Sequence, residues 1–175
     1  MAKAKPLDFQ ILSELLRNSK VSDRQIAKKL GVSQPTITRR RSKLEKSLIE
    51  GYTVLPSMKE LGFEIIALTF MASRREALTH GRLEEAQSKA RKWHAKHPNV
   101  LFVGGGHGMG WNGVMVSLHK SFSDYAKFKA EHNKEFAEYI ADTNSFIMEL
   151  NSDTALKPFN LSYLADLGTL TPEKS

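Results

Sequence analysis

The 175-residue chain contains no cysteine, no long apolar segment and no low-complexity tract. Without cysteine there can be no disulfide and no thiolate metal ligand, and this composition fits a reducing compartment. The N-terminal sequence MAKAKPLDFQ lacks the apolar core of a secretory signal, and no apolar run approaches the roughly 20 residues that span a bilayer. The sequence therefore predicts a soluble, cytoplasmic protein that does not enter a membrane.

Patterns that carry catalysis or bind metal ions are also missing. No nucleophile–base arrangement and no carboxylate pair can be argued from residue spacing, so catalysis has no support. His94 and His97 have the i,i+3 spacing of metal ligands on one helix, but Pro98 follows directly and no cysteine is available. A solvated helix end is the better interpretation. We expect no metal, no cofactor and no enzymatic activity.

Positive charge is plentiful but confined to one part of the chain. The formal net charge is +7. Residues 1–60 contain 13 Lys and Arg against 6 Asp and Glu, an excess of seven, whereas residues 61–175 contain 13 of each. A surface that served only solubility would not require this segregation, whereas a module that binds phosphates would. The first third of the chain is therefore the predicted nucleic-acid-binding part.

Two short helices joined by a tight turn are predicted within this basic third. Ser22 can cap the first helix, and Gln25 has the spacing of a capping box. Gly31 follows the last apolar residue, where a left-handed conformation ends a helix. Ser33 can cap the second helix, and Pro35 in its first turn costs no hydrogen bond. This pattern is typical of a helix-turn-helix.

The second of these helices has an apolar side and a basic side. At about 100° per residue, Ile37, Leu44 and Leu48 share the apolar stripe. Short polar residues at the start of the other side can reach base edges in a DNA major groove, and later cations can reach phosphates. The alternative is an ordinary amphipathic helix pair with a solvated basic face. The candidate DNA-binding residues are Ser33, Gln34, Pro35, Thr36, Thr38, Arg39, Arg40, Arg41, Lys43 and Lys46.

A third helix and a connecting strand complete the predicted N-terminal domain. From Leu7 to Leu16, apolar residues recur at helical spacing and predict a helix that packs behind the pair. Three helices in about 45 residues are few for independent stability, so we expect support from a partner subunit or from the next domain. Residues 48–56 have the composition of a strand that Gly51 interrupts and Pro56 ends.

The rest of the chain predicts a second domain with the order strand, helix, strand, strand, helix, strand. This βαββαβ order is that of the ferredoxin-like α+β sandwich, an antiparallel sheet with both helices on one face. The open face of such a sheet is usually covered by a second copy or a ligand. The expected elements are residues 63–72, 82–96, 100–103, 114–118, 121–141 and 144–151.

We therefore divide the chain into four parts. The helix-turn-helix domain occupies residues 1–50, the linker strand 51–61, the ferredoxin-like domain 62–151, and a tail 152–175. The tail has enough apolar residues to dock on the body of the protein or on a neighbour. These residues are Phe159, Leu161, Tyr163, Leu164 and Leu167.

A stretch rich in glycine, residues 104–113, is expected to be a loop between two strands. Its Gly108-x-Gly110-x-x-Gly113 spacing matches a dinucleotide-binding fingerprint, but a strand follows where a helix should begin, so that function is set aside. So many glycines favour close approach of a ligand or a subunit over a simple hairpin. The candidate ligand-binding residues are Gly104, Gly106, His107, Gly108, Gly110, Trp111 and Asn112.

The sequence resembles the Lrp/AsnC family of leucine-responsive or feast/famine transcription regulators. The resemblance covers residues 7 to about 150, and it implies a homodimer built through the ferredoxin-like domains and often assembled into larger rings, up to octamers. It also implies binding to double-stranded DNA and a small-molecule effector, usually an amino acid. The matching residues are Leu7-Asp8, Ile11-Leu12, Ser22, Ile26-Ala27, Gly31-Val32-Ser33, Pro35-Thr36-Ile37, Arg39-Arg40, Leu44, Ile49, Gly51-Tyr52 and Leu61-Gly62-Phe63.

Three positions depart from the family pattern. Arg41 stands where the family usually has Val or Ile, and we expect its stem to lie along the core while its head reaches solvent or phosphate. Ser47 replaces the usual helix-ending glycine. Residues 110–113, Gly-Trp-Asn-Gly, replace a turn that commonly carries acidic residues, so this stretch suits the acidic end of an effector better than its ammonium group.

Three functions remain open from the sequence alone. The first is a sequence-specific transcription regulator. The second is a chromatin-like architectural protein that uses the same basic helix with little sequence preference, and the two differ in the ratio of specific to non-specific affinity. The third is a ferredoxin-like metabolite-binding protein or enzyme with a vestigial helix-turn-helix.

Overall fold

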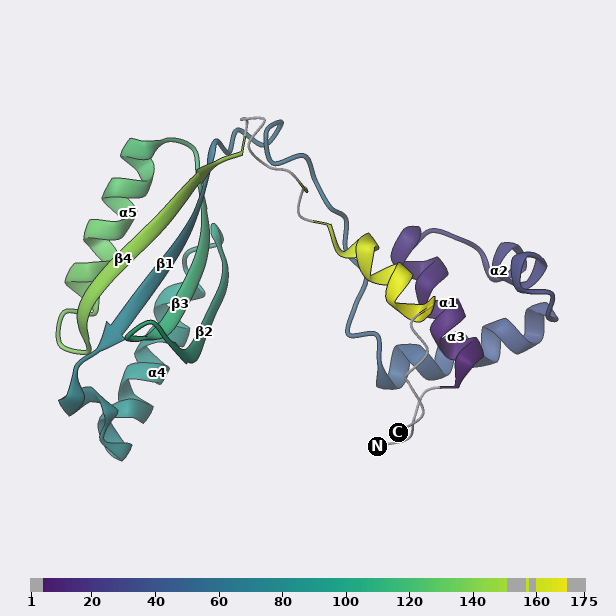
Figure 1. The fold of residues 1–175 in the computed structure, drawn as a ribbon, viewed down its shortest axis with the longest axis horizontal. Coiled ribbons are helices and arrows are strands. Elements are labelled where there is room, and N and C mark those ends of the chain that lie inside the picture. The colour runs from purple at the N-terminus through teal and green to yellow at the C-terminus, as the bar shows by residue number, and fades with distance from the viewer. Residues whose placement is uncertain (1–4, 151–156, 158–159, 170–175) are drawn as a thin grey trace. The chain divides into compact units, whose positions relative to one another are not determined.

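The computed structural model describes residues 5–150, 157 and 160–169, and the chain divides into two compact units (Figure 1). The first unit is Met1–Leu55 together with Lys157–Ser175, and the second is Pro56–Leu156. Among the described residues, no helix has the length and apolar character needed to cross a bilayer. Each unit has its own hydrophobic core.

Three helices form the body of the first unit: α1 (Pro6–Arg17), α2 (Asp23–Leu30) and α3 (Gln34–Ser47). Apolar residues that recur at helical spacing in each helix pack together in one core, as the sequence predicts. A short 3-10 helix near the C-terminus, η2 (Leu161–Thr169), lies against α1. The core residues of the three helices are Ile11, Leu15, Ile26, Ala27, Ile37 and Leu44.

The ends of α2 and the start of α3 follow the predicted chemistry with one exception. Gln25 N–H donates to Ser22 Oγ over 3.3 Å, and Gln25 Oε1 accepts from Ser22 N–H over 2.9 Å, which completes the capping box. Gly31 ends α2 with a φ of 67°, in the left-handed region. Ser33 is the N-cap residue of α3, but its hydroxyl bonds the Thr36 hydroxyl over 2.8 Å and no backbone N–H.

The expected linker strand is wrong. Residues 49–64 form no strand, and the described residues there hold only turns and extended chain. A strand needs a neighbouring strand to satisfy its backbone groups, and no strand of the described residues pairs with the linker. Leu48, expected on the inner stripe of the second helix, is instead the exposed C-cap residue of α3.

The second unit is the predicted ferredoxin-like sandwich. Its four strands form an antiparallel sheet in the order β2-β3-β1-β4, and β1 occupies a central position between β3 and β4. The short 3-10 helix η1 (Arg75–Leu78) precedes the first long helix. The other elements are β1 (Ile65–Ser73), α4 (His80–His94), β2 (Val100–Gly108), β3 (Trp111–His119), α5 (Phe122–Glu135) and β4 (Ile140–Glu149).

Two boundaries differ from the expectation for a physical reason. The second helix was expected to run to residue 141, but α5 ends at Glu135 and β4 begins at Ile140. Ile140 pairs with Ser73 of β1, so sheet hydrogen bonds decide the conformation of a stretch whose composition also suits a helix. Phe122, the first residue of α5, is 63% exposed.

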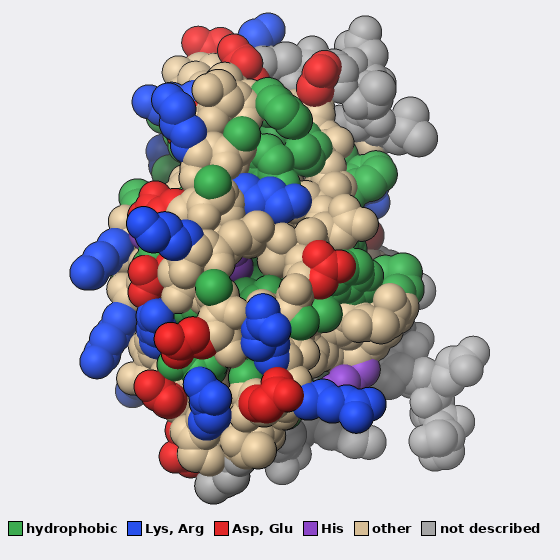
Figure 2. Space-filling model, turned by 90° about the vertical axis from the view of Figure 1, so that its left-hand side faces the viewer, with side chains coloured by type: hydrophobic (Ala, Val, Ile, Leu, Met, Phe, Trp, Pro, Cys, Tyr) green, Lys and Arg blue, Asp and Glu red, His purple; other side chains and the backbone are tan. Residues whose placement is uncertain are grey.

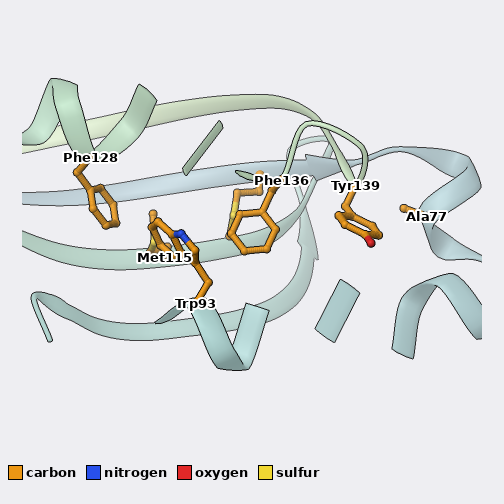
Figure 3. Packing of buried hydrophobic residues seen from close by; sticks show 7 residues of the cluster. Ala77, Trp93, Met115, Phe128, Phe136 and Tyr139 are labelled. Atoms are coloured by element: carbon orange, nitrogen blue, oxygen red, sulfur yellow. The ribbon is translucent and has the colours of Figure 1, made fainter. Parts of the chain in front are cut away.

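Both helices pack on the same face of the sheet. Figure 3 shows Trp93 from α4, Phe128 from α5 and Phe136, the C-cap residue of α5, in one cluster with Met115 of β3. Trp93 is the centre of this core, because its ring lies 5.5 Å from that of Phe128 and 5.6 Å from that of Phe136. Aromatic pairs at such separations stabilise a core beyond the area they bury.

The opposite face of the sheet is apolar and has no cover within the described part of the chain. Register places Phe102, Val116, Leu68 and Phe146 in one row across all four strands. Phe146 is 62% exposed, and Phe102 and Met148 are exposed as well. An uncovered apolar row of this kind marks an interaction surface.

A histidine is buried within the aromatic core of the second unit. His132 is 2% exposed, and its ring lies 5.4 Å from that of Trp93 and 4.8 Å from that of Phe136. Burial, together with the neighbouring His94 and His97, lowers the pKa of His132 from 6.5 to about 4. Burial also lowers the pKa values of His94 and His119. The core is therefore built around neutral imidazoles.

We expect the second unit to lose stability in mild acid. Between pH 6.5 and 4 the unfolded chain protonates His132 and the folded chain does not, so the free energy of unfolding falls as pH falls. The loss from this residue is roughly 3 kcal/mol at pH 4. Urea unfolding at pH 7 and pH 4 measures it. We expect the free energy of unfolding of His132→Phe to fall less between pH 7 and pH 4 than that of wild type. His107→Gln changes an exposed histidine and is expected to lose as much as wild type. Equal losses in all three would contradict this assignment.

Candidate functional site

The exposed side of α3 carries the cations that the sequence assigned to DNA. Arg39, Lys43 and Lys46 are exposed, and no ion pair or hydrogen bond engages their side chains within the described residues. Gln34 and Pro35 are exposed at the N-terminal end of the same helix. Small or polar residues therefore lead and free cations follow, which is the arrangement that a major-groove helix requires.

Two other candidate residues bind α2. Asp23, the first residue of α2, accepts hydrogen bonds from Thr38 Oγ1 over 2.7 Å and from Arg41 Nη1 over 3.1 Å. Arg41 Nη1 also donates to the Val21 carbonyl over 3.2 Å, and its Nε donates to Glu45 Oε1 over 3.1 Å. The head of Arg41 is therefore held by three protein groups, and its hydrogen bond to Glu45 lies at the surface.

Arg40 binds α1. Its Nη1 donates to Asp8 Oδ1 over 2.8 Å, and both side chains are largely buried. Burial alone would raise the pKa of Asp8, but hydrogen bonds from Arg40 and the Lys5 backbone N–H outweigh it and lower that pKa. The ion pair is therefore intact at neutral pH. A helical wheel predicts on which side of its helix a residue lies. It does not predict that an acidic residue of a neighbouring helix, here Asp8 of α1, binds it.

The glycine-rich stretch is a β-hairpin, and the expected loop is wrong. β2 continues to Gly108 and β3 begins at Trp111, so the turn consists of two residues, Met109 at φ 50° and Gly110 at φ 81°. This is the geometry of a tight hairpin, in which both turn residues take positive φ. Gly110 is the only glycine of this hairpin with a positive φ. Turn geometry therefore leaves the glycines of β2 unexplained.

A close approach of neighbouring groups explains two more glycines. A Cβ on Gly104 would lie 2.7 Å from Cζ of Phe102, so a side chain there would displace the ring. A Cβ on Gly113 would lie 3.2 Å from Cε of Met71. Gly106 and Gly108 have open space where a side chain would be. These two glycines are not required by packing within one chain.

The polar candidates of the hairpin differ in their availability. Asn112 Oδ1 already accepts from the Ser73 backbone N–H over 2.9 Å and from the Ser73 hydroxyl over 3.1 Å. The Trp111 ring lies 6.5 Å from that of Phe70. His107 is exposed. The structure therefore uses Asn112 to tie the hairpin to β1 and leaves His107 open to solvent.

A groove beside β2 brings in residues that sequence reasoning missed. Its cavity of about 480 Å³ lies between α4 and β2, with Gly104 and Gly105 on one wall and Gln87, Arg91 and His94 on the other. Arg91 is the cation of this groove. Nothing in the sequence signals the site, because it depends on the packing of α4 against an edge strand.

His94 and His97 each bond the backbone through Nδ1. The Nδ1 of each bonds a carbonyl four residues earlier in the chain, at Ala90 and Trp93, over 2.7 Å in both cases. Within the described residues, no group of three or more His, Cys, Asp or Glu converges as metal ligands.

Comparison with known proteins agrees with these observations. The family model for winged helix-turn-helix DNA-binding matches residues 5–47. The HTH-type transcriptional regulator LrpA of Pyrococcus horikoshii is 38% identical over 72 residues, which are 41% of this chain and 51% of LrpA. The chain thus spans about half the length of this and similar curated relatives. The HTH-type transcriptional regulator Ptr1 of Methanocaldococcus jannaschii is 38% identical over 126 residues, 71% of this chain and 78% of Ptr1.

Solved structures match the fold over most of the chain. The structure of AsnC from E. coli has a TM-score of 0.72 at 19% identity and covers 90% of this chain and 99% of its own. A transcriptional regulator from Neisseria meningitidis, solved as a complex with L-Met, has a TM-score of 0.71 at 18% identity and covers 89% and 97%. The order of elements, the buried helix-turn-helix core and the match to Ptr1 together show that this chain belongs to the Lrp/AsnC family.

Proposed function

We propose that the protein is a sequence-specific transcription regulator that inserts α3 into the major groove of double-stranded DNA. The observation that carries this proposal is the separation of roles among the α3 side chains. Arg40 and Arg41 are held by Asp8 and Asp23, whereas Arg39, Lys43 and Lys46 have no partner within the described residues. Family membership supports the same function.

The rest of the surface supports this assignment of charge. Figure 2 shows a face of the second unit on which Lys and Arg lie interspersed with Asp and Glu. Residues 61–175 have no net charge, so the excess of Lys and Arg lies in residues 1–60, which contain α1, α2 and α3. A phosphate backbone attracts such an excess over a long range.

The contribution of α3 can be separated into base readout and phosphate binding. We expect Arg39→Ala to weaken binding to the selected operator by about 1–3 kcal/mol, because it removes a base-edge contact. Lys46→Ala weakens binding to all sequences equally and lowers the salt slope by about one. The assay is a titration of operator and random DNA at several salt concentrations, after binding-site selection.

Lys127→Ala is the matched control, because it removes an exposed cation from α5 in the second unit. An unchanged operator affinity for Arg39→Ala would overturn the face assignment. Equal affinity of wild type for operator and random DNA would favour the architectural alternative.

We infer that two copies associate through the open face of the sheet. The row formed by Phe102, Val116, Leu68 and Phe146 crosses all four strands, and its ends are exposed. A second copy has the same apolar row and can cover it symmetrically. Dimerisation would also give two α3 helices, and the operator would then be a pseudo-palindrome with half-sites about one helical turn apart.

We expect Phe146→Asp to convert the dimer to a monomer, because it places a charge in the apolar row. Light scattering at micromolar concentration measures the mass. Phe122→Asp is the matched control, since Phe122 is as exposed as Phe146 but lies on α5. A monomeric wild type, or a dimeric Phe146→Asp variant, would remove this face from the interface.

We further propose that a small molecule with a carboxylate group, such as an amino acid, binds at the hairpin. The Neisseria meningitidis relative contains L-Met, and this chain has the same fold. The β2 edge presents unshielded backbone groups at Gly104, Gly106 and Gly108, with His107 beside them and no acidic residue in the hairpin. Arg91 in the adjoining groove supplies a positive charge. Such a surface suits an anionic group.

Gly106→Val tests the hairpin without disturbing the fold of one chain. A Cβ at Gly106 meets nothing within 4 Å and its backbone needs no positive φ, so the variant can fold. We expect at least tenfold weaker effector binding or altered assembly, because the valine occupies space that a ligand or a neighbouring subunit uses. Calorimetry against amino acids and organic acids measures the affinity, and light scattering measures assembly. Equal binding and equal mass would exclude the hairpin.

A further inference from the structure

The first helix of the DNA-binding unit is buried on two sides. Ile11 and Leu15 face the core shared with α2 and α3. Ser13 lies about 200° around the helix from Ile11, yet it is only 8% exposed. A helix that packed only on α2 and α3 would leave Ser13 in water. A second element must therefore cover the outer side of α1, which we define as the side containing Ser13.

The element that covers this outer side is η2. Residues 161–169 lie against α1, and Ala165 is 1% exposed (Figure 1). The small side chains of Ser13 and Ala165 allow two helices to approach closely. At the edge of the contact, Arg17 Nη2 donates to Asp166 Oδ1 over 2.8 Å. The C-terminal segment thus completes a unit that three helices alone leave open.

The chain enters and leaves the second unit at one end of its sheet. Ile65 at the start of β1 pairs with Glu149 at the end of β4, and the Leu150 N–H donates to the Glu64 carbonyl over 2.7 Å. The two connections therefore start from neighbouring strands. Because the chain then returns to the first unit at residue 157, the second unit is an insertion in the first.

The first of these connections, which leads from α3 to β1, is held on α3 by Tyr52. Tyr52 Oη donates to Glu45 Oε1 over 2.7 Å, and the Arg41 guanidinium lies 5.5 Å from the centroid of the Tyr52 ring. Arg41 in turn binds Asp23 of α2. The chain that leads to the effector-binding unit is therefore attached to α3, and the chain that returns from it is attached to α1.

We propose that the outer side of α1 is a docking surface for the protein's own C-terminal 3-10 helix, η2, and that this helix is a functional part of the DNA-binding unit. This inference rests on the DNA-binding function proposed above. The docked segment stabilises α1, and α1 holds α3 through the Asp8–Arg40 ion pair. Release of the segment would loosen the support of α3 and weaken DNA binding.

Ala165→Glu tests the proposal by burying a charge against α1. Leu161→Glu is the matched control, because it adds the same charge to an exposed position of the same 3-10 helix. Hydrogen exchange of the α1 amides reports docking, and operator titration reports function. The two tryptophans, Trp93 and Trp111, both lie in the second unit, so their fluorescence reports whether that unit remains folded.

We expect α1 to exchange at least tenfold faster and operator affinity to fall at least tenfold in Ala165→Glu, with the tryptophan unfolding transition unchanged. Leu161→Glu stays within threefold of wild type. A chain truncated after residue 156 gives the same result by a second route. Unchanged hydrogen exchange of α1 in both Ala165→Glu and the truncated chain would overturn the docking. Faster exchange with unchanged operator affinity would overturn the functional role. The exchange result holds even if wild type binds no DNA, so the two proposals fail separately.

A crosslink determines which chain supplies the segment. Since the protein has no cysteine, Arg17→Cys with Asp166→Cys creates the only thiol pair, at two side chains that are in contact. A short bismaleimide is expected to give a crosslinked single chain on a denaturing gel, and each single-cysteine variant is the control. A covalent dimer specific to the double variant would show that the segment comes from a second copy and would overturn attachment within one chain.

Discussion

Two carboxylates hold α3, and the surface that we propose for DNA binding depends on them. Asp8 at the start of α1 binds Arg40, and Asp23 at the start of α2 binds Arg41 and Thr38. Each carboxylate also lies at the N-terminal end of a helix, where the backbone N–H groups favour a negative charge. These pairs hold the side of α3 that contains Arg40 and Arg41. The cations on the exposed side of α3 are therefore free to contact a ligand.

The pairs are partly buried, which gives them more weight than surface ion pairs. Removing one partner would leave a charge in a poorly solvated position, whereas an exposed pair contributes little. Arg41 shows this most clearly, because its guanidinium bonds Asp23, Glu45 and the Val21 carbonyl and lies near the Tyr52 ring. A residue that departs from the family pattern thus connects α2, α3 and the linker.

The two faces of the sheet follow different physical rules. The helix-covered face holds neutral histidines among aromatic rings, with His132 in contact with Trp93 and Phe136. Such a core loses stability when its imidazoles become charged. The open face has no titratable group in its central row, which consists of Phe102, Val116, Leu68 and Phe146. The first face therefore responds to pH, and the second is suited to association.

The sequence by itself determined the local structure wherever local chemistry decides it. The capping box of Ser22 and Gln25, the left-handed Gly31 and the strand–helix order of the second unit were all predictable, because each depends on neighbouring residues or on hydrophobic periodicity. Only the tertiary structure decided what distant residues do. It paired Arg40 with Asp8 and made a hairpin of the expected glycine loop. It also placed η2 on α1, because contacts between residues far apart in sequence outweigh local preference.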